Sequence, residues 1–216
     1  MSDQAGVGGS LKQRLLWGLL AAVMLAIVFT TIMAPHWSRQ NAPRTPATLG
    51  PAPEFALVNR DGTTLSNRDL LGTPWVADFI FTRCALSCPR MTSRMRQLGD
   101  LWSAELGIAR VSFSVDPEYD SPEVLQSYAT SWQIEDPRWF FLTGDREQMK
   151  SMVMDGFKLA VEMDPAPGTF SPDEPILHST RFVLVDARGQ IRGYYDVAQG
   201  AELERLLRDL EVLAAE

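Results

Sequence analysis

Residues Trp75–Met91 read WVADFIFTRCALSCPRM, and this stretch decides the fold. The run Trp75–Thr82 is nearly continuous and apolar, which is typical of a strand buried on both faces of a sheet. Pro89 suits the first turn of a following helix, because no backbone N–H is needed there. Both cysteines of the chain, Cys84 and Cys88, lie between the two elements. We therefore expect two thiols at the carboxyl end of a strand, where reactive groups of α/β sheets collect.

Strand and helix patterns alternate along the rest of the chain. A β-hairpin is predicted over 54–66, with Asp61-Gly62 as its turn. The other predicted elements are strands over 108–115 and 138–144, helices over 121–132 and 146–157, a second hairpin over 180–197 and a closing helix over 201–215. This order predicts a largely parallel central sheet that the second hairpin makes mixed. The fold class is therefore α/β and thioredoxin-like, a mixed central sheet flanked by helices with an extra N-terminal β-hairpin.

The first fifty residues differ in composition from the rest. Leu15–Ala34 contains no charged residue and is about as long as a helix that crosses a bilayer. Residues 35–53 contain five prolines among small polar residues, which indicates an extended tether. We expect a cytoplasmic N-terminus over 1–14, a transmembrane anchor over 15–34, a tether over 35–53 and a domain over 54–216. A cleaved signal peptide is the alternative to the anchor. Charge leaves the orientation open, because two basic residues flank the span on each side.

Charge divides along the same boundary. The whole chain has a net charge of −7, residues 1–50 carry +3, and the remainder therefore carries −10. Phosphate binding needs the opposite sign, so an acidic domain argues against a nucleic-acid partner.

Two cysteines separated by three residues at a helix start have several possible roles. A structural disulfide would close a very short loop, and short loops give the smallest stabilisation of the folded state. A structural zinc site needs four ligands, and the chain contains few candidate residues for them. A redox couple and a metal site both stay open. The helix N-terminus is expected to favour thiolates. No acidic residue lies between Asp78 and Asp100. Four arginines in that segment are also expected to favour thiolates, because their positive charges stabilise a nearby anion: Arg83, Arg90, Arg94 and Arg96.

The predicted domain contains a single histidine, His178, which directly precedes the strand expected in the second hairpin. In a thioredoxin-like layout the loop entering that strand abuts the helix that carries the cysteines. Two thiolates and one imidazole form a soft site that suits copper, above all Cu(I). Asp116 ends a strand at the same edge, where it either orients His178 or contacts a partner, or else caps the turn into the next helix. Met91 and Met95 follow helical spacing and are interpreted as core residues.

Three segments resemble the Sco/SenC family, whose members are thioredoxin-fold copper proteins that help to assemble the copper centre of cytochrome c oxidase. FTRCALSCPRM is similar to the family's C-x-x-x-C-P motif. SFSVDPEYDSPEVLQSYA is similar to its D-P-x-x-D-[TS]-P segment. LHSTRFVLVDARGQI resembles its histidine-bearing hairpin. The resemblance implies that Cys84, Cys88 and His178 bind copper. The insert Ala85-Leu86-Ser87 departs from the family, which often has a proline and an acid between the cysteines.

The resemblance also implies a function and a location. The expected function is a membrane-anchored chaperone that delivers copper, as Cu(I) or Cu(II), to the copper-bearing subunit of cytochrome c oxidase or to another copper protein. The expected location is a bacterial inner membrane, with one span and the domain in the periplasm as a soluble monomer. Two alternatives use the same thiols. One is a thiol–disulfide oxidoreductase in which Cys84 attacks and Cys88 resolves, and the other is a copper or redox sensor.

Overall fold

The structure, a computed structural model, describes residues 11–33, 45–84, 87–101, 108–159 and 180–215. The chain divides into two compact units, residues 1–43 and 44–216.

The first unit is helical in its described part. Helix α1 (Leu11–Val28) continues into one π-helical turn, η1 (Phe29–Met33). The Thr31 hydroxyl donates to the Ile27 carbonyl at 2.6 Å, so this polar group is satisfied within the helix. Among the described residues this is the one helix long and apolar enough to cross a membrane, over Gln13–Thr31. The predicted apolar N-terminal helix is therefore present.

The second unit is built on a mixed sheet of eight strands in the order β1-β8-β7-β4-β5-β6-β2-β3. Strands β4, β5 and β6 are mutually parallel, whereas β7 is antiparallel to β4 and β8 to β7. The strands are β1 (Gly50–Pro51), β2 (Ala56–Asn59), β3 (Thr64–Ser66), β4 (Trp75–Ile80), β5 (Ala109–Ser114), β6 (Trp139–Thr143), β7 (Arg181–Val185) and β8 (Gln190–Asp196). All residues of β4 are buried, as expected for a central strand. The predicted mixed sheet is confirmed.

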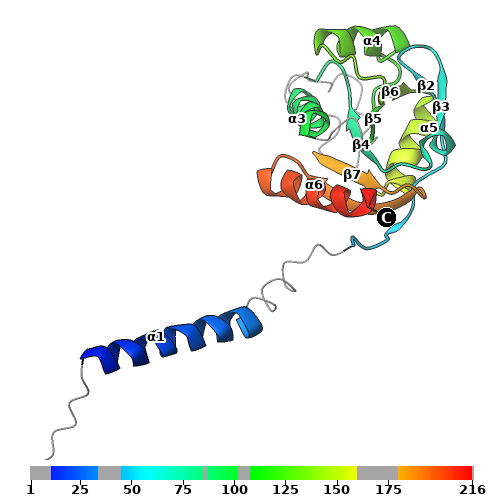
Figure 1. Ribbon diagram of the computed structural model, residues 1–216. Coiled ribbons are helices and arrows are strands. Elements are labelled where there is room, and N and C mark those ends of the chain that lie inside the picture. The colour runs from blue at the N-terminus through cyan, green and yellow to red at the C-terminus, as the bar shows by residue number, and fades with distance from the viewer. Residues whose placement is uncertain (1–10, 34–44, 85–86, 102–107, 160–179, 216) are drawn as a thin grey trace, which may run out of the picture. The chain divides into compact units, whose positions relative to one another are not determined.

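Helices cover both faces of this sheet (Figure 1). They are η2 (Asn67–Leu70), α3 (Ser87–Leu101), α4 (Pro122–Ser131), α5 (Arg146–Ser151) with its continuation η4 (Met152–Gly156), and α6 (Gly200–Ala214). On one face Phe157 packs against Phe79 of β4, with 5.2 Å between ring centroids. On the other face Arg110 of β5 donates to the Met95 carbonyl of α3 at 3.1 Å. The side chains that alternate along β4 and β5 therefore face α5 and η4 on one side and α3 on the other.

Local signals position two helix starts as predicted. The Ser121 hydroxyl accepts a hydrogen bond from the Val124 N–H before the Pro122 that opens α4. The Asp145 carboxylate accepts one from the Gln148 N–H at the start of α5. Such caps satisfy backbone donors that have no partner within the helix.

The two edges of the sheet are formed by N-terminal segments. The predicted hairpin is β2–β3, and β2 pairs with β6. Its turn has Gly62 at φ +81°, a left-handed conformation that favours glycine. At the opposite edge β1 pairs with β8, and the Pro46 carbonyl accepts hydrogen bonds from the Arg192 guanidinium at 2.6 and 3.1 Å. Residues 45–53, which composition assigned to the tether, therefore lie against the domain.

Candidate functional site

The two cysteines lie at the junction of β4 and α3. The Cys84 N–H bonds to the Phe81 carbonyl in the turn after β4, and Cys88 is the second residue of α3. Both are thiols and both are buried, with 7% and 3% of their surface exposed. The Cys88 N–H donates to the Cys84 sulfur at 3.5 Å, and the Ser87 hydroxyl lies 3.6 Å from it. The fold thus brings both thiols together at the helix start, as predicted.

The two thiols are not equivalent. The pKa of Cys88 lies well above the ordinary thiol value, because its side chain hydrogen-bonds with the Cys84 side chain and because it is buried. We expected the helix N-terminus and the arginines to favour the thiolate at both positions, and for Cys88 this expectation is wrong. The free energy needed to form a thiolate that is buried beside a second sulfur is larger than the stabilisation that the helix N-terminus provides. The Cys84 sulfur, by contrast, accepts the backbone N–H of Cys88, a contact that favours its thiolate form.

The loop that carries Cys84 is held by the loop between β5 and α4. The Asp120 carboxylate accepts hydrogen bonds from the Thr82 N–H at 3.2 Å, the Thr82 hydroxyl at 2.5 Å and the Ser114 hydroxyl at 2.6 Å. Asp120 is fully buried, and burial raises its pKa although these donors oppose the change. Asp120 thus fixes the chain two residues before Cys84. The D-P-x-x-D segment signalled this residue, but its partner could not be inferred from the sequence.

Asp116 lies at the same edge and pairs with Arg83. The Arg83 Nε donates to the Asp116 carboxylate at 2.6 Å, and the guanidinium lies 4.7 Å from the centroid of the Tyr119 ring. The pair joins the residue before Cys84 to the end of β5. Asp116 therefore acts on the cysteine loop through Arg83 in the described structure. Its predicted role in orienting His178 stays a prediction.

Asp78 is a buried carboxyl that sequence reasoning did not single out. It lies in the middle of β4 opposite Ser112, with no surface exposed. In the described part of the chain neither of its oxygens has a hydrogen-bond partner. Burial raises the pKa of Asp78 to about 7, which the nearby Ser112 hydroxyl and the charge of Arg110 offset only in part. Asp78 also raises the pKa of Cys88. The signal was available, since a carboxylate interrupts an otherwise apolar strand.

The third predicted ligand, His178, lies outside the described residues. The described chain resumes at Thr180, and β7 is antiparallel to β4, with Ala77 opposite Val183. The first residue of β7 is therefore at the end of the sheet where β4 ends and the cysteines begin. Among the described residues no three His, Cys, Asp or Glu side chains gather as a metal site. Met91 and Met95 are buried, which confirms them as core residues.

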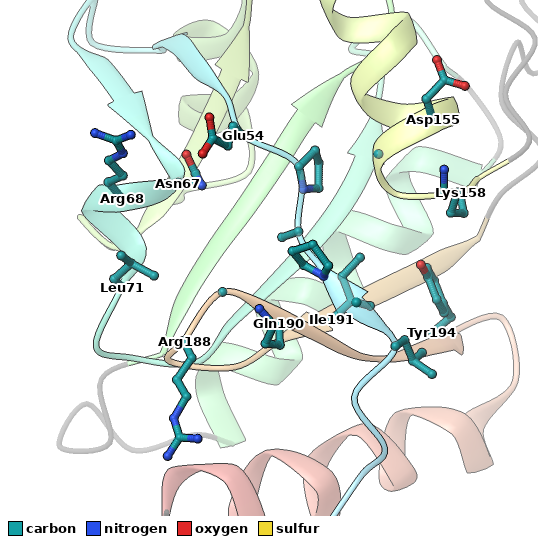
Figure 2. A pocket seen from close by; sticks show the side chains of 17 residues that line it. Glu54, Asn67, Arg68, Leu71, Asp155, Lys158, Arg188, Gln190, Ile191 and Tyr194 are labelled. Carbon is teal, nitrogen blue, oxygen red and sulfur yellow. The ribbon is translucent and has the colours of Figure 1, made fainter.

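A separate open pocket of about 710 Å³ lies away from the thiols (Figure 2). It is lined by the chain entry at 49–54, by η2 and by the turn between β7 and β8. That turn adjoins the start of β4, because Trp75 pairs with Val185. The cysteines follow the other end of β4, so pocket and thiols lie at opposite ends of the sheet. The pocket mixes charges of both signs, such as Arg68, Arg188 and Asp155, and contains no thiol.

Known proteins share this architecture. The chain is 31% identical over 159 residues to the SCO1 protein homolog of Bacillus subtilis, covering 73% of this chain and 79% of that protein. A SCO1/SenC family lipoprotein from Bacillus anthracis has 34% identity and a TM-score of 0.70, covering 80% of this chain and 99% of that chain. BsSco, described as a member of the Sco family of cytochrome c oxidase assembly proteins with a disulfide switch, has 29% identity and a TM-score of 0.68, covering 79% and 96%.

Copper-bound structures occur among the proteins that share this fold. ScoI of Bradyrhizobium japonicum, solved with copper bound, has a TM-score of 0.55 and 24% identity, covering 71% of this chain and 98% of that chain, a likeness of fold alone. The SCO1/SenC family model matches residues 43–215, which is nearly the whole folded unit and includes the cysteine loop, the loop that contains Asp120, and the hairpin after His178. This match and the buried thiol pair lead to one conclusion, that the chain belongs to the SCO1/SenC family.

Proposed function

We propose that this protein is a membrane-anchored copper chaperone for the copper centre of cytochrome c oxidase. The observation that carries the proposal is the pair of adjacent, buried thiols of Cys84 and Cys88 in a chain of the SCO1/SenC family. In this function copper is cargo that the protein binds and passes on without net turnover. Delivery of the metal and preparation of the acceptor's thiols both use this pair.

The donor set suits the cargo. Two sulfurs match the preference of Cu(I) for soft ligands, and the imidazole of His178 would add the nitrogen that Cu(II) favours. Metal-bound sulfur is thiolate, so binding must release the thiol proton of Cys88, whose pKa is raised. Copper affinity is therefore expected to increase with pH. The start of β7, three residues after His178, supports the third ligand because it lies at the cysteine end of the sheet.

The anchor and the location extend the proposal. The candidate membrane segment Gln13–Thr31 contains no charged residue after Arg14, and residues 34–44 connect its helix to the domain in sequence. We infer a single span in a bacterial inner membrane, a cytoplasmic N-terminus and a periplasmic, monomeric domain. The acceptor is the copper-bearing subunit of the oxidase or another copper protein.

A thiol–disulfide reductase is the second candidate. It is favoured by the unequal thiols, because the Cys84 sulfur accepts the Cys88 N–H while Cys88 is buried behind it. The Cys84 thiolate would attack a substrate disulfide and release one substrate thiolate. Cys88, after losing its proton, would attack the mixed disulfide and release the second. Two electrons pass to the substrate, and Cys84–Cys88 becomes a disulfide. A copper or redox sensor would respond through the same two thiols, by binding copper or by forming the disulfide.

Metal analysis of the reduced protein separates these functions. The parent should bind one copper per chain, and Cys84→Ser or Cys88→Ser should bind neither valence. His178→Ala should lose Cu(II) and weaken Cu(I) less, because both sulfurs remain. A parent that binds no copper, or a His178→Ala variant that binds both valences like the parent, would refute the three-ligand site. Retained disulfide exchange would then favour the reductase.

A further inference from the structure

An exposed aromatic ring and a cation lie directly beside the cysteine loop. In the described part of the domain, Tyr119 is the only aromatic among the exposed large apolar side chains, with 49% of its surface exposed. The Arg83 guanidinium lies over its ring, and this side chain is 38% exposed. Exposed tyrosine and arginine side chains are enriched among the residues that dominate binding energy at protein interfaces. Arg83 directly precedes the buried Cys84 in the sequence, so the pair adjoins the cysteine loop.

The segment that carries the thiols has a net charge opposite in sign to that of the domain as a whole. Residues 79–99 contain four arginines and no acidic residue, whereas the chain after residue 50 carries −10. Arg90, two residues after Cys88, is exposed and forms no ion pair with a described residue. By contrast, Arg94 bonds to Gln97, and Arg96 donates to the Trp132 carbonyl. Arg90 thus presents its charge at the helix start, where the helix dipole is also positive.

Among the described residues, three acidic side chains at this edge already have partners. In the loop after β5, Asp116 pairs with Arg83 and Glu118 with Arg146 at 3.0 Å. Asp120 is buried and hydrogen-bonded. Arg83 precedes Cys84, Arg90 follows Cys88 by two residues and Tyr119 lies against Arg83; these three exposed side chains are here called the cysteine-edge patch. Asp116 offsets the charge of Arg83, so within the described chain the net positive charge of the patch comes from Arg90.

We propose that the cysteine-edge patch docks a protein whose own thiol or copper site is ringed by acidic side chains. The proposal rests on the proposed function and names the kind of partner that this function needs. Sulfur-to-sulfur transfer and copper exchange both require the partner's site to reach two buried thiols, so its rim must contact the residues around them. Charge complementarity accelerates such encounters, in steered cases by 10- to 10³-fold at low ionic strength.

The test compares disulfide probes that differ only in charge. The full reduced chain in nonionic detergent is mixed with a cyclic peptide disulfide flanked by glutamates, with the same peptide flanked by lysines, and with neutral hydroxyethyl disulfide. In each single-turnover reaction the protein dithiol becomes a disulfide and the probe becomes two thiols. We expect the acidic peptide to react roughly tenfold faster than the basic one at low salt, and the difference to disappear near 0.5 M salt.

Variants locate the effect. Arg90→Glu should reduce the preference for the acidic peptide roughly tenfold, after normalisation to the neutral probe, which corrects for any change in the thiols themselves. Tyr119→Ala should slow both peptides, but not the neutral probe. The matched control Arg208→Glu, an exposed arginine on α6, should leave all ratios unchanged. Equal rates for both peptides, or an Arg90→Glu effect equal on every probe, would overturn the docking surface.

Copper binding, measured on the same samples, separates the two proposals. A parent that binds copper but shows no charge preference keeps the proposed function and loses the docking surface. A parent that binds no copper but retains the preference keeps the docking surface and loses the chaperone function.

Discussion

Substitution of the buried carboxyl in β4, Asp78→Asn, should make the domain more stable at neutral pH. Burial raises the pKa of Asp78 from 3.8 to about 7. Each pKa unit corresponds to about 1.4 kcal/mol, so ionisation of Asp78 in the folded state costs roughly 4 kcal/mol relative to the unfolded chain. Asparagine has nearly the same shape and does not ionise. An asparagine amide at this position would have no hydrogen-bond partner among the described residues, and the cost of burying it offsets part of the stability gained by removing the carboxyl.

The sign follows from where each state holds the proton. Between about pH 4 and pH 7 the unfolded chain has lost the Asp78 proton and the folded domain retains it. The contribution of Asp78 to stability is therefore present below pH 4 and is lost as the pH rises to 7. The free energy of unfolding of Asp78→Asn, minus that of the parent, should thus increase by roughly 4 kcal/mol from pH 4 to pH 8.

Urea unfolding of the reduced domain, started at Thr45, measures this difference at pH 4, 6 and 8. Asp69→Asn is a control of opposite sign, because hydrogen bonds from Ser66 lower the pKa of Asp69. Asp69 therefore adds stability that is lost as the pH falls. If the difference between Asp78→Asn and the parent does not change with pH, Asp78 is not an uncompensated buried carboxyl.

Asp120→Ala should lower stability by roughly 3 kcal/mol in urea melts and slow disulfide exchange by Cys84, because three donors on Thr82 and Ser114 lose their acceptor; unchanged melts would refute the anchoring role. A domain started at Thr45 should remain soluble and monomeric by light scattering, whereas one started at Glu54 should melt lower, since it lacks β1; equal melting temperatures would contradict this. An export-dependent reporter fused after Glu216 should be active, and activity only of a cytoplasmic reporter would reverse the topology.

Much of the fold was predictable because its signals are local. The uninterrupted apolar run of β4 indicated a strand buried on both faces, and all of its residues are buried. Ser121 and Asp145 accept hydrogen bonds from N–H groups three residues later, so their caps depend only on neighbouring residues. The turn glycines Gly62 and Gly189 have φ values of +81° and +77°, which glycine adopts at little cost. Each of these features involves residues within one short segment.

The composition of the N-terminal region was a weaker guide. Proline content predicted a tether as far as residue 53, yet β1 and Pro46 lie against β8. A strand of two residues is too short to show a periodic pattern in the sequence. Proline is compatible both with an extended tether and with an edge strand of a sheet. This segment packs on the domain because β1 pairs with β8 and the buried Arg192 guanidinium donates to the Pro46 carbonyl, contacts that only the tertiary structure shows.

The chemical groups of the site could be identified from the sequence alone, as two thiols at a helix start and a basic segment free of acids. Tertiary structure decided their chemical state. The burial that helps to raise the pKa of Cys88, the lack of a partner for Asp78 among the described residues and the anchoring of Thr82 by Asp120 all depend on segments that are separate in sequence. Burial and pairing at such distances depend on how strands and helices pack, and the free energy of a charge depends on that environment more than on its neighbours along the chain.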